Sequence, residues 1–182
     1  MMSKISFPSR LASLLLAVLA LTACSPEMDW RSVGFEGSTL KVQLPCKPDR
    51  TTRRVTMGAS SVDLHVAGCE LDHSMVAVMT AQLPQGADAN AILLGWQNIT
   101  LDNARARVDT RQPWSKSGMM ALPASERVQA LGQRPDGRPV QMQAVWGAFA
   151  QAEHMHIVHA VVYSDKRSEE PAATLFDAIA SR

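Results

Sequence analysis

The spacing of apolar and polar residues predicts a chain that is mostly β-strand. Alternation of apolar with polar residues, or a short continuous apolar run, is typical of strands. These patterns predict strands at residues 30–35, 40–44, 51–57, 61–69, 75–83, 126–132, 138–150 and 154–163. Turn-forming residues at 58–60 and 135–137 separate neighbouring strands and favour hairpins. The short connections therefore indicate a mainly antiparallel sheet.

Two segments have apolar residues three and four positions apart, which indicates a helix. The first runs from Ala89 to about Arg107, with Asp88 as its N-cap. The second follows Ser168 and carries the apolar stripe Leu175, Phe176 and Ile179. Residues 112–124 have no regular pattern. We expect an α+β fold, with one central and one C-terminal helix packed on the sheet, in a single domain over residues 30–182.

Composition narrows the class of protein without naming its activity. Of the 182 residues, 46% are hydrophobic and 19% charged, as in a globular domain. The 18 Lys and Arg are balanced by 17 Asp and Glu, which argues against a nucleic-acid partner.

The N-terminus has the features of a secretory signal. Lys4 and Arg10 precede an apolar run over residues 11–21, which is too short to span a bilayer. Removal of residues 1–23 takes away two basic residues and no acid, so the mature chain has 16 basic and 17 acidic residues.

The segment Leu21–Cys24 resembles the lipobox of bacterial lipoproteins. The resemblance implies cleavage before Cys24 and covalent attachment of diacylglycerol and an N-acyl chain to it; the alternative is an ordinary signal peptide that happens to contain Cys. Ser25 implies the outer membrane, facing the periplasm. We expect a short lipidated tether at residues 24–29, which brings the domain close to the membrane surface, and no other cofactor.

Two cysteines remain in the mature domain, Cys46 and Cys69. An even pair in an oxidising compartment predicts a disulfide. A redox motif would need Cys-x-x-Cys spacing, which the pair does not have.

Glu153-His154-Met155-His156 is the densest group of metal-binding residue types. In a strand, His154 and His156 share a face and could chelate copper or zinc. The alternative is that His154 is solvated and His156 packs in the core.

Arg50, Arg53 and Arg54 form a basic run. Such a run is usually a solvated face, but close to a lipid anchor it could contact anionic headgroups.

No hydrolase elbow, phosphate loop, dinucleotide fingerprint or zinc-protease motif occurs in the sequence, so we expect no enzyme and no catalytic residues. The Trp30 start and the segment Leu44–Pro48 are similar to small uncharacterised periplasmic lipoproteins of proteobacteria, and the element order resembles the PsbP-like α+β sandwich. The expected function is a binding or assembly module of the envelope, whose partners are the membrane and another envelope protein. The alternative is a metal- or small-ligand-binding lipoprotein that uses the His154 region.

Overall fold

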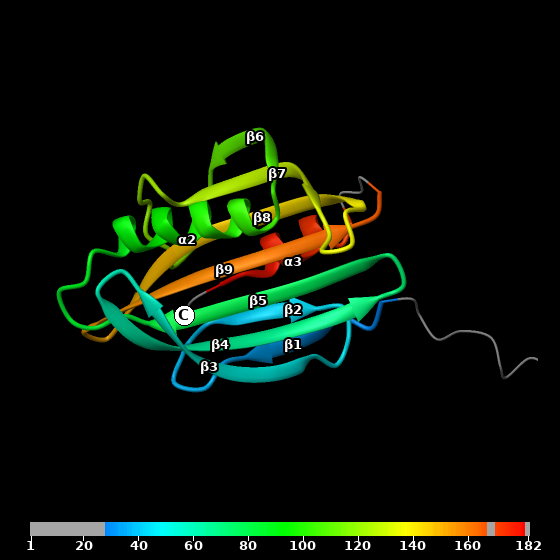
Figure 1. Cartoon of the computed structure of the whole chain (residues 1–182). Helices are drawn as coiled ribbons and strands as arrows, with labels where there is room; N and C mark the ends of the chain where they lie inside the picture. The colour runs from blue at the N-terminus through cyan, green and yellow to red at the C-terminus, as the bar shows by residue number, and fades with distance from the viewer. Residues whose placement is uncertain (1–27, 167–169, 181–182) are drawn as a thin grey trace, which may run out of the picture.

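Seven antiparallel strands form the central sheet of the computed structural model, which describes residues 28–166 and 170–180. The spatial order is β3-β4-β5-β9-β8-β7-β6 (Figure 1). The strands are β3 (Asp49–Met57), β4 (Ser60–Leu71), β5 (Ser74–Gln82), β6 (Arg107–Pro113), β7 (Glu126–Gln133), β8 (Pro139–Gln151) and β9 (His154–Ser164). The pairing of β5 with β9 joins the two halves of the sheet, with Ser74 opposite Ser164.

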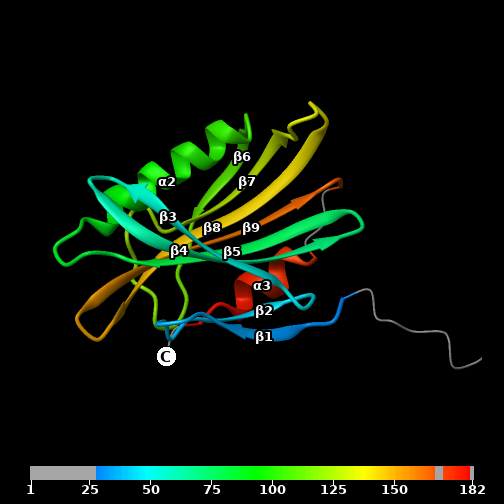
Figure 2. The same ribbon diagram turned by 60° about the horizontal axis from the view of Figure 1, so that its bottom comes forward.

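Each face of this sheet is covered by a different layer (Figure 2). Helix α2 (Ala89–Asn103) lies on one face. The other face carries helix α3 (Ala172–Ala178) and a two-stranded sheet of β1 (Arg31–Gly34) and β2 (Lys41–Leu44). The arrangement confirms the expected α+β domain, with a mainly antiparallel sheet and one central and one C-terminal helix.

The sheet therefore has a hydrophobic core on each side. Strands β8 and β9 are apolar at both parities because both of their faces are covered. On β9, Ile157 and Val161 belong to the core under α2, and Val158 and Val162 to the core under α3. Within residues 28–166 and 170–180, the core residues lie between Val33 and Ile179, downstream of the predicted anchor.

Helix α2 begins where the sequence predicts. The Asp88 carboxylate accepts a hydrogen bond from the backbone N–H of Ala91 at 3.0 Å, which satisfies a donor of the first turn. The buried face of the helix repeats every four residues and consists of Ala89, Leu93, Gln97 and Leu101. The Gln97 Nε2 donates to the Ala124 carbonyl at 2.6 Å, so this polar member of the stripe is satisfied.

Two elements differ from the prediction. Helix α2 ends at Asn103 rather than near Arg107, because Arg105 adopts a left-handed φ of 45° and β6 begins at Arg107. Strand β6 was not predicted at all, since it is an exposed edge strand without apolar alternation.

Helix α3 begins at Ala172, and the expected N-cap Ser168 lies outside the described residues. In the described ranges no helix has the length and apolarity needed to cross a membrane.

The predicted disulfide is confirmed. Cys46 follows β2 and Cys69 lies on β4, with their Cα atoms 6.0 Å apart. The bond ties the small two-stranded layer to the central sheet.

Candidate functional site

A groove runs along α2, between the helix and the strands of the β3–β4–β5 half of the sheet. Two adjoining cavities form it, and both are lined by Trp96 and Asn103. We call the cavity under the β3–β4 turn the hairpin cavity, the one over the middle of the sheet the sheet cavity, and the two together the α2 groove. Their volumes are about 680 Å³ and about 510 Å³, within the range of small-molecule sites.

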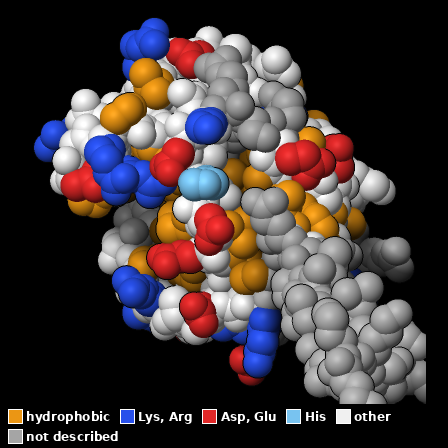
Figure 3. All heavy atoms as spheres, turned by 90° about the vertical axis from the view of Figure 1, so that its right-hand side faces the viewer, with side chains coloured by type: hydrophobic (Ala, Val, Ile, Leu, Met, Phe, Trp, Pro, Cys, Tyr) orange, Lys and Arg blue, Asp and Glu red, His pale blue; other side chains and the backbone are white. Residues whose placement is uncertain are grey.

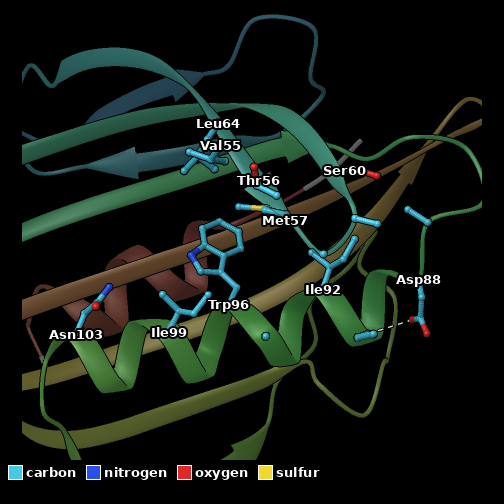
Figure 4. A pocket seen from close by; sticks show the side chains of 15 residues that line it. Val55, Thr56, Met57, Ser60, Leu64, Asp88, Ile92, Trp96, Ile99 and Asn103 are labelled. Atoms are coloured by element: carbon cyan, nitrogen blue, oxygen red, sulfur yellow. Dashed lines mark hydrogen bonds between the residues drawn. The ribbon is translucent and has the colours of Figure 1, made fainter.

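Apolar side chains supply most of the walls of the hairpin cavity (Figure 4). The indole of Trp96 extends from α2 toward the hairpin, and Ile92 lies below the β3–β4 turn. The opposite wall comes from β3 and β4 and consists of Val55, Met57 and Leu64.

One end of the groove is closed by the turn between β3 and β4. Gly58 has a φ of 60°, which favours glycine, and a Cβ at this position would lie 3.6 Å from Ile92 Cγ1. The turn therefore lies close to the helix there, and Asn103 lines the cavity near the other end of α2 (Figure 4).

The groove exists because α2 is apolar on more than one face. Beside its buried stripe, Ile92 and Trp96 are half-buried and form the inner wall. Next to them, Ala91, Gly95 and Ile99 form the exposed lip of the groove, and Ile99 is 60% exposed. Among the described residues of α2, Ile99 is the large apolar side chain most open to water.

His159 forms part of the floor of the sheet cavity. Its ring stacks on Trp146 with centroids 4.4 Å apart and meets Trp96 edge-on at 5.2 Å. Nδ1 lies 3.1 Å from the Val145 carbonyl and must donate, because a carbonyl only accepts. Burial lowers the pKa of His159 to about 4, so near neutral pH the ring is uncharged and its Nε2 is a hydrogen-bond acceptor.

Tyr163 is the other titratable group of β9 in this cavity. Burial raises the pKa of Tyr163, so its hydroxyl stays protonated near neutral pH. The floor thus combines an apolar surface with a few neutral polar groups, which is a combination suited to binding and orienting a guest.

The two histidines predicted to bind a metal lie on the face of β9 opposite to the groove. His154 is exposed, whereas His156 is 3% exposed and stacks on Phe149 with centroids 5.1 Å apart. Burial lowers the pKa of His156, and His154 lowers it further. No cluster of three or more His, Cys, Asp or Glu that could hold a metal ion occurs among residues 28–166 and 170–180. Metal binding by this pair stays a prediction.

The structure does not bring the three predicted membrane-contact arginines into one patch. Arg50 donates to the Gly34 carbonyl at 2.9 Å, and Arg54 pairs with Asp63 at 3.0 Å. Arg53 is exposed, and its side chain has no hydrogen bond or ion pair with the part of the chain that the structure describes. Contact with lipid headgroups stays a prediction for all three.

Cys24, the predicted signal over residues 1–23 and most of the predicted tether lie outside the described residues. The described chain begins at Met28, and the backbone N–H of Asp29 donates to the Pro45 carbonyl at 2.9 Å. Met28 lines a cavity of about 460 Å³ beside the β4–β5 turn, together with Leu71 and Pro171. Figure 3 views this end of the molecule and shows apolar side chains there among acidic and basic ones.

Sequence reasoning missed the α2 groove altogether. The pattern predicts a helix from Ala89 to about Arg107, but it does not say that two of its faces are apolar or that His159 lies beside Trp96. The available signal was the number of apolar residues on α2, which exceeds what one buried stripe needs: Ile92, Leu93, Leu94, Trp96, Ile99 and Leu101.

Comparisons with known proteins give no functional description. No protein-family model matches the chain, and no curated protein matches it. Among solved structures, the chain is similar to a protein of unknown function, PA94, from Pseudomonas aeruginosa, with a TM-score of 0.38 and 12% sequence identity. The similarity covers 79% of this chain and 90% of that chain.

Proposed function

We propose that the protein is a lipid-anchored, non-enzymatic binding module of the bacterial envelope, and that the α2 groove holds its guest. The observation that carries the proposal is the groove itself, with Trp96 and Ile99 on one wall and the β3–β4 hairpin on the other. The anchor and the outer-membrane location rest on the lipobox-like segment ending at Cys24 and on Ser25.

An apolar guest would gain free energy by covering the wall that water now contacts. Ile99, which lines the hairpin cavity, is 60% exposed. Burial of apolar surface contributes roughly 25 cal/mol per Å². A guest that covers Ile99 and Trp96 therefore removes from water the largest apolar feature of this helix.

The position of the tether agrees with a guest that comes from the envelope. Three residues lie between Cys24 and Met28, where the described chain begins, so the two Cα atoms are at most roughly 14 Å apart. Glu70 lines both the sheet cavity and the cavity that contains Met28, so the groove reaches the end of the domain at which the tether enters.

Binding of a neutral apolar fluorophore, N-phenyl-1-naphthylamine, to the mature chain with Cys24→Ser tests the proposal. We expect a rise in fluorescence on binding that Gly95→Phe removes, because residue 95 lines the groove and a Cβ there has no atom within 4 Å. Asn98→Phe is the matched control, since Asn98 is an exposed residue of the same helix that does not line the groove.

Fluorescence that is unchanged by Gly95→Phe, or reduced equally by both substitutions, would reject the groove as the binding site.

A further inference from the structure

Strand β3 contributes apolar residues to the wall of the α2 groove, and the next residue on the same face of the strand is the charged Arg53. Alternate residues of a strand face the same way, so Arg53 shares a face with Val55 and Met57, which line the hairpin cavity. Arg53 also lies directly opposite Leu64 of β4, another residue of that wall. The Arg53 side chain is therefore on the groove side of the sheet, one step along the strand from the apolar wall.

The charge of Arg53 is not neutralised by a neighbour. Arg50 and Arg54, on the opposite face of β3, are bound to the Gly34 carbonyl and to Asp63. Arg53 makes no ion pair with any residue in the described ranges. Arg50 also lines the sheet cavity, but its guanidinium is held by the Gly34 carbonyl, whereas the Arg53 guanidinium has no such partner among the described residues.

The acidic residues of the groove lie away from Arg53. Asp88 is at the closed end of the hairpin cavity, where its carboxylate accepts from the Ala91 N–H at 3.0 Å. Asp49 and Glu70 line the sheet cavity, toward the end at which the tether enters. Between them, Arg53 lies on β3 two residues from Val55 and opposite Leu64, both of which line the apolar hairpin cavity.

Resting on the proposed function, we propose that the guest is a single-chain anionic amphiphile of the fatty-acid type. Its acyl chain lies in the hairpin cavity against Trp96 and Ile92, and its carboxylate binds the Arg53 guanidinium. The cavity volume of about 680 Å³ suits one acyl chain, and a guanidinium binds a carboxylate through two parallel hydrogen bonds. A neutral guest would use the same walls but not the charge.

Displacement of N-phenyl-1-naphthylamine by saturated fatty acids and by their neutral methyl esters tests this. The protein is the mature chain with Cys24→Ser, which contains every core residue of the described part of the chain. Each two-carbon extension should tighten binding roughly tenfold until the cavity is filled. At low ionic strength the acid should bind about threefold more tightly than its ester. Salt at 1 M should remove this difference, because the Debye length is then roughly 3 Å.

Substitutions at two adjacent arginines separate the charge effect from folding. Arg53→Ala should make the acid and the ester bind equally, and Arg53→Lys should restore part of the difference. Arg54→Ala should leave the difference intact, because Arg54 is next along the same strand but on its other face. Equal thermal stability of the Arg53 variants and the parent shows that the fold is retained.

The outcomes distinguish this inference from the proposed function. Esters that displace the probe as well as acids do, with no effect of Arg53→Ala, would overturn the anionic amphiphile and leave an apolar guest in the groove. Failure of the parent chain to bind the probe, the acids and the esters would overturn both.

Discussion

Substitution of Gly95 by alanine should stabilise the protein. Gly95 is an exposed residue in the interior of α2, and a Cβ added there would have no atom within 4 Å. The gain is therefore the difference in helix propensity alone, about 1 kcal/mol in favour of alanine. With an unfolding entropy of about 2.1 cal/mol/K per residue, a domain of this size should gain about 3 °C in Tm.

Reversible thermal and urea unfolding, followed by circular dichroism of the mature chain, measures this change. Gly147→Ala provides the contrast, because a Cβ at Gly147 would lie 2.7 Å from Cζ3 of Trp114. That substitution should destabilise the fold by about 1–3 kcal/mol. If Gly95→Ala left Tm unchanged or lowered it, a Cβ at the lip of the groove would meet other atoms, and the open groove described here would be wrong.

Three further predictions concern the cysteines and His159. Replacing Cys46 and Cys69 together by alanine should lower the free energy of unfolding by about 3 kcal/mol, as measured in urea; an unchanged midpoint would contradict the role of the bond. Burial lowers the pKa of His159 in the folded state to about 4 from 6.5, so as pH falls the unfolded chain takes up a proton before the folded chain does. The free energy of unfolding should therefore keep its full value above pH 6.5 and fall by about 3 kcal/mol as pH decreases to 4. His159→Phe should flatten this dependence on pH. In cells, palmitate should label the protein but not its Cys24→Ala variant, and label retained by that variant would reject the lipid anchor.

The strand and helix pattern of the central sheet could be predicted because local residue spacing determines it. The runs that became β8 and β9 are apolar at both parities, and the structure buries both of their faces. The N-cap Asp88 also marks the start of α2 correctly. The strand β6 could not be found, because an exposed edge strand needs no apolar alternation.

The candidate site could not be predicted because it depends on contacts between distant segments. The β3–β4 turn reaches Ile92 of α2, more than thirty residues further along the chain. Trp96 and His159 meet only after β9 has paired with β5. A pattern read along one element identifies its apolar faces, but it does not say which face a neighbouring element leaves uncovered.

The pairing of β5 with β9 has a consequence for how the chain folds as it emerges from its N-terminus onward. Ser74 and Ser164 are opposite each other, although ninety residues separate them. The β3–β4–β5 meander can form from local contacts, but its edge strand β5 then presents Val76 and Val78, both fully buried in the final fold, without a partner strand. The sheet is therefore completed only once the last strand is available, and until then the chain carries an aggregation-prone edge.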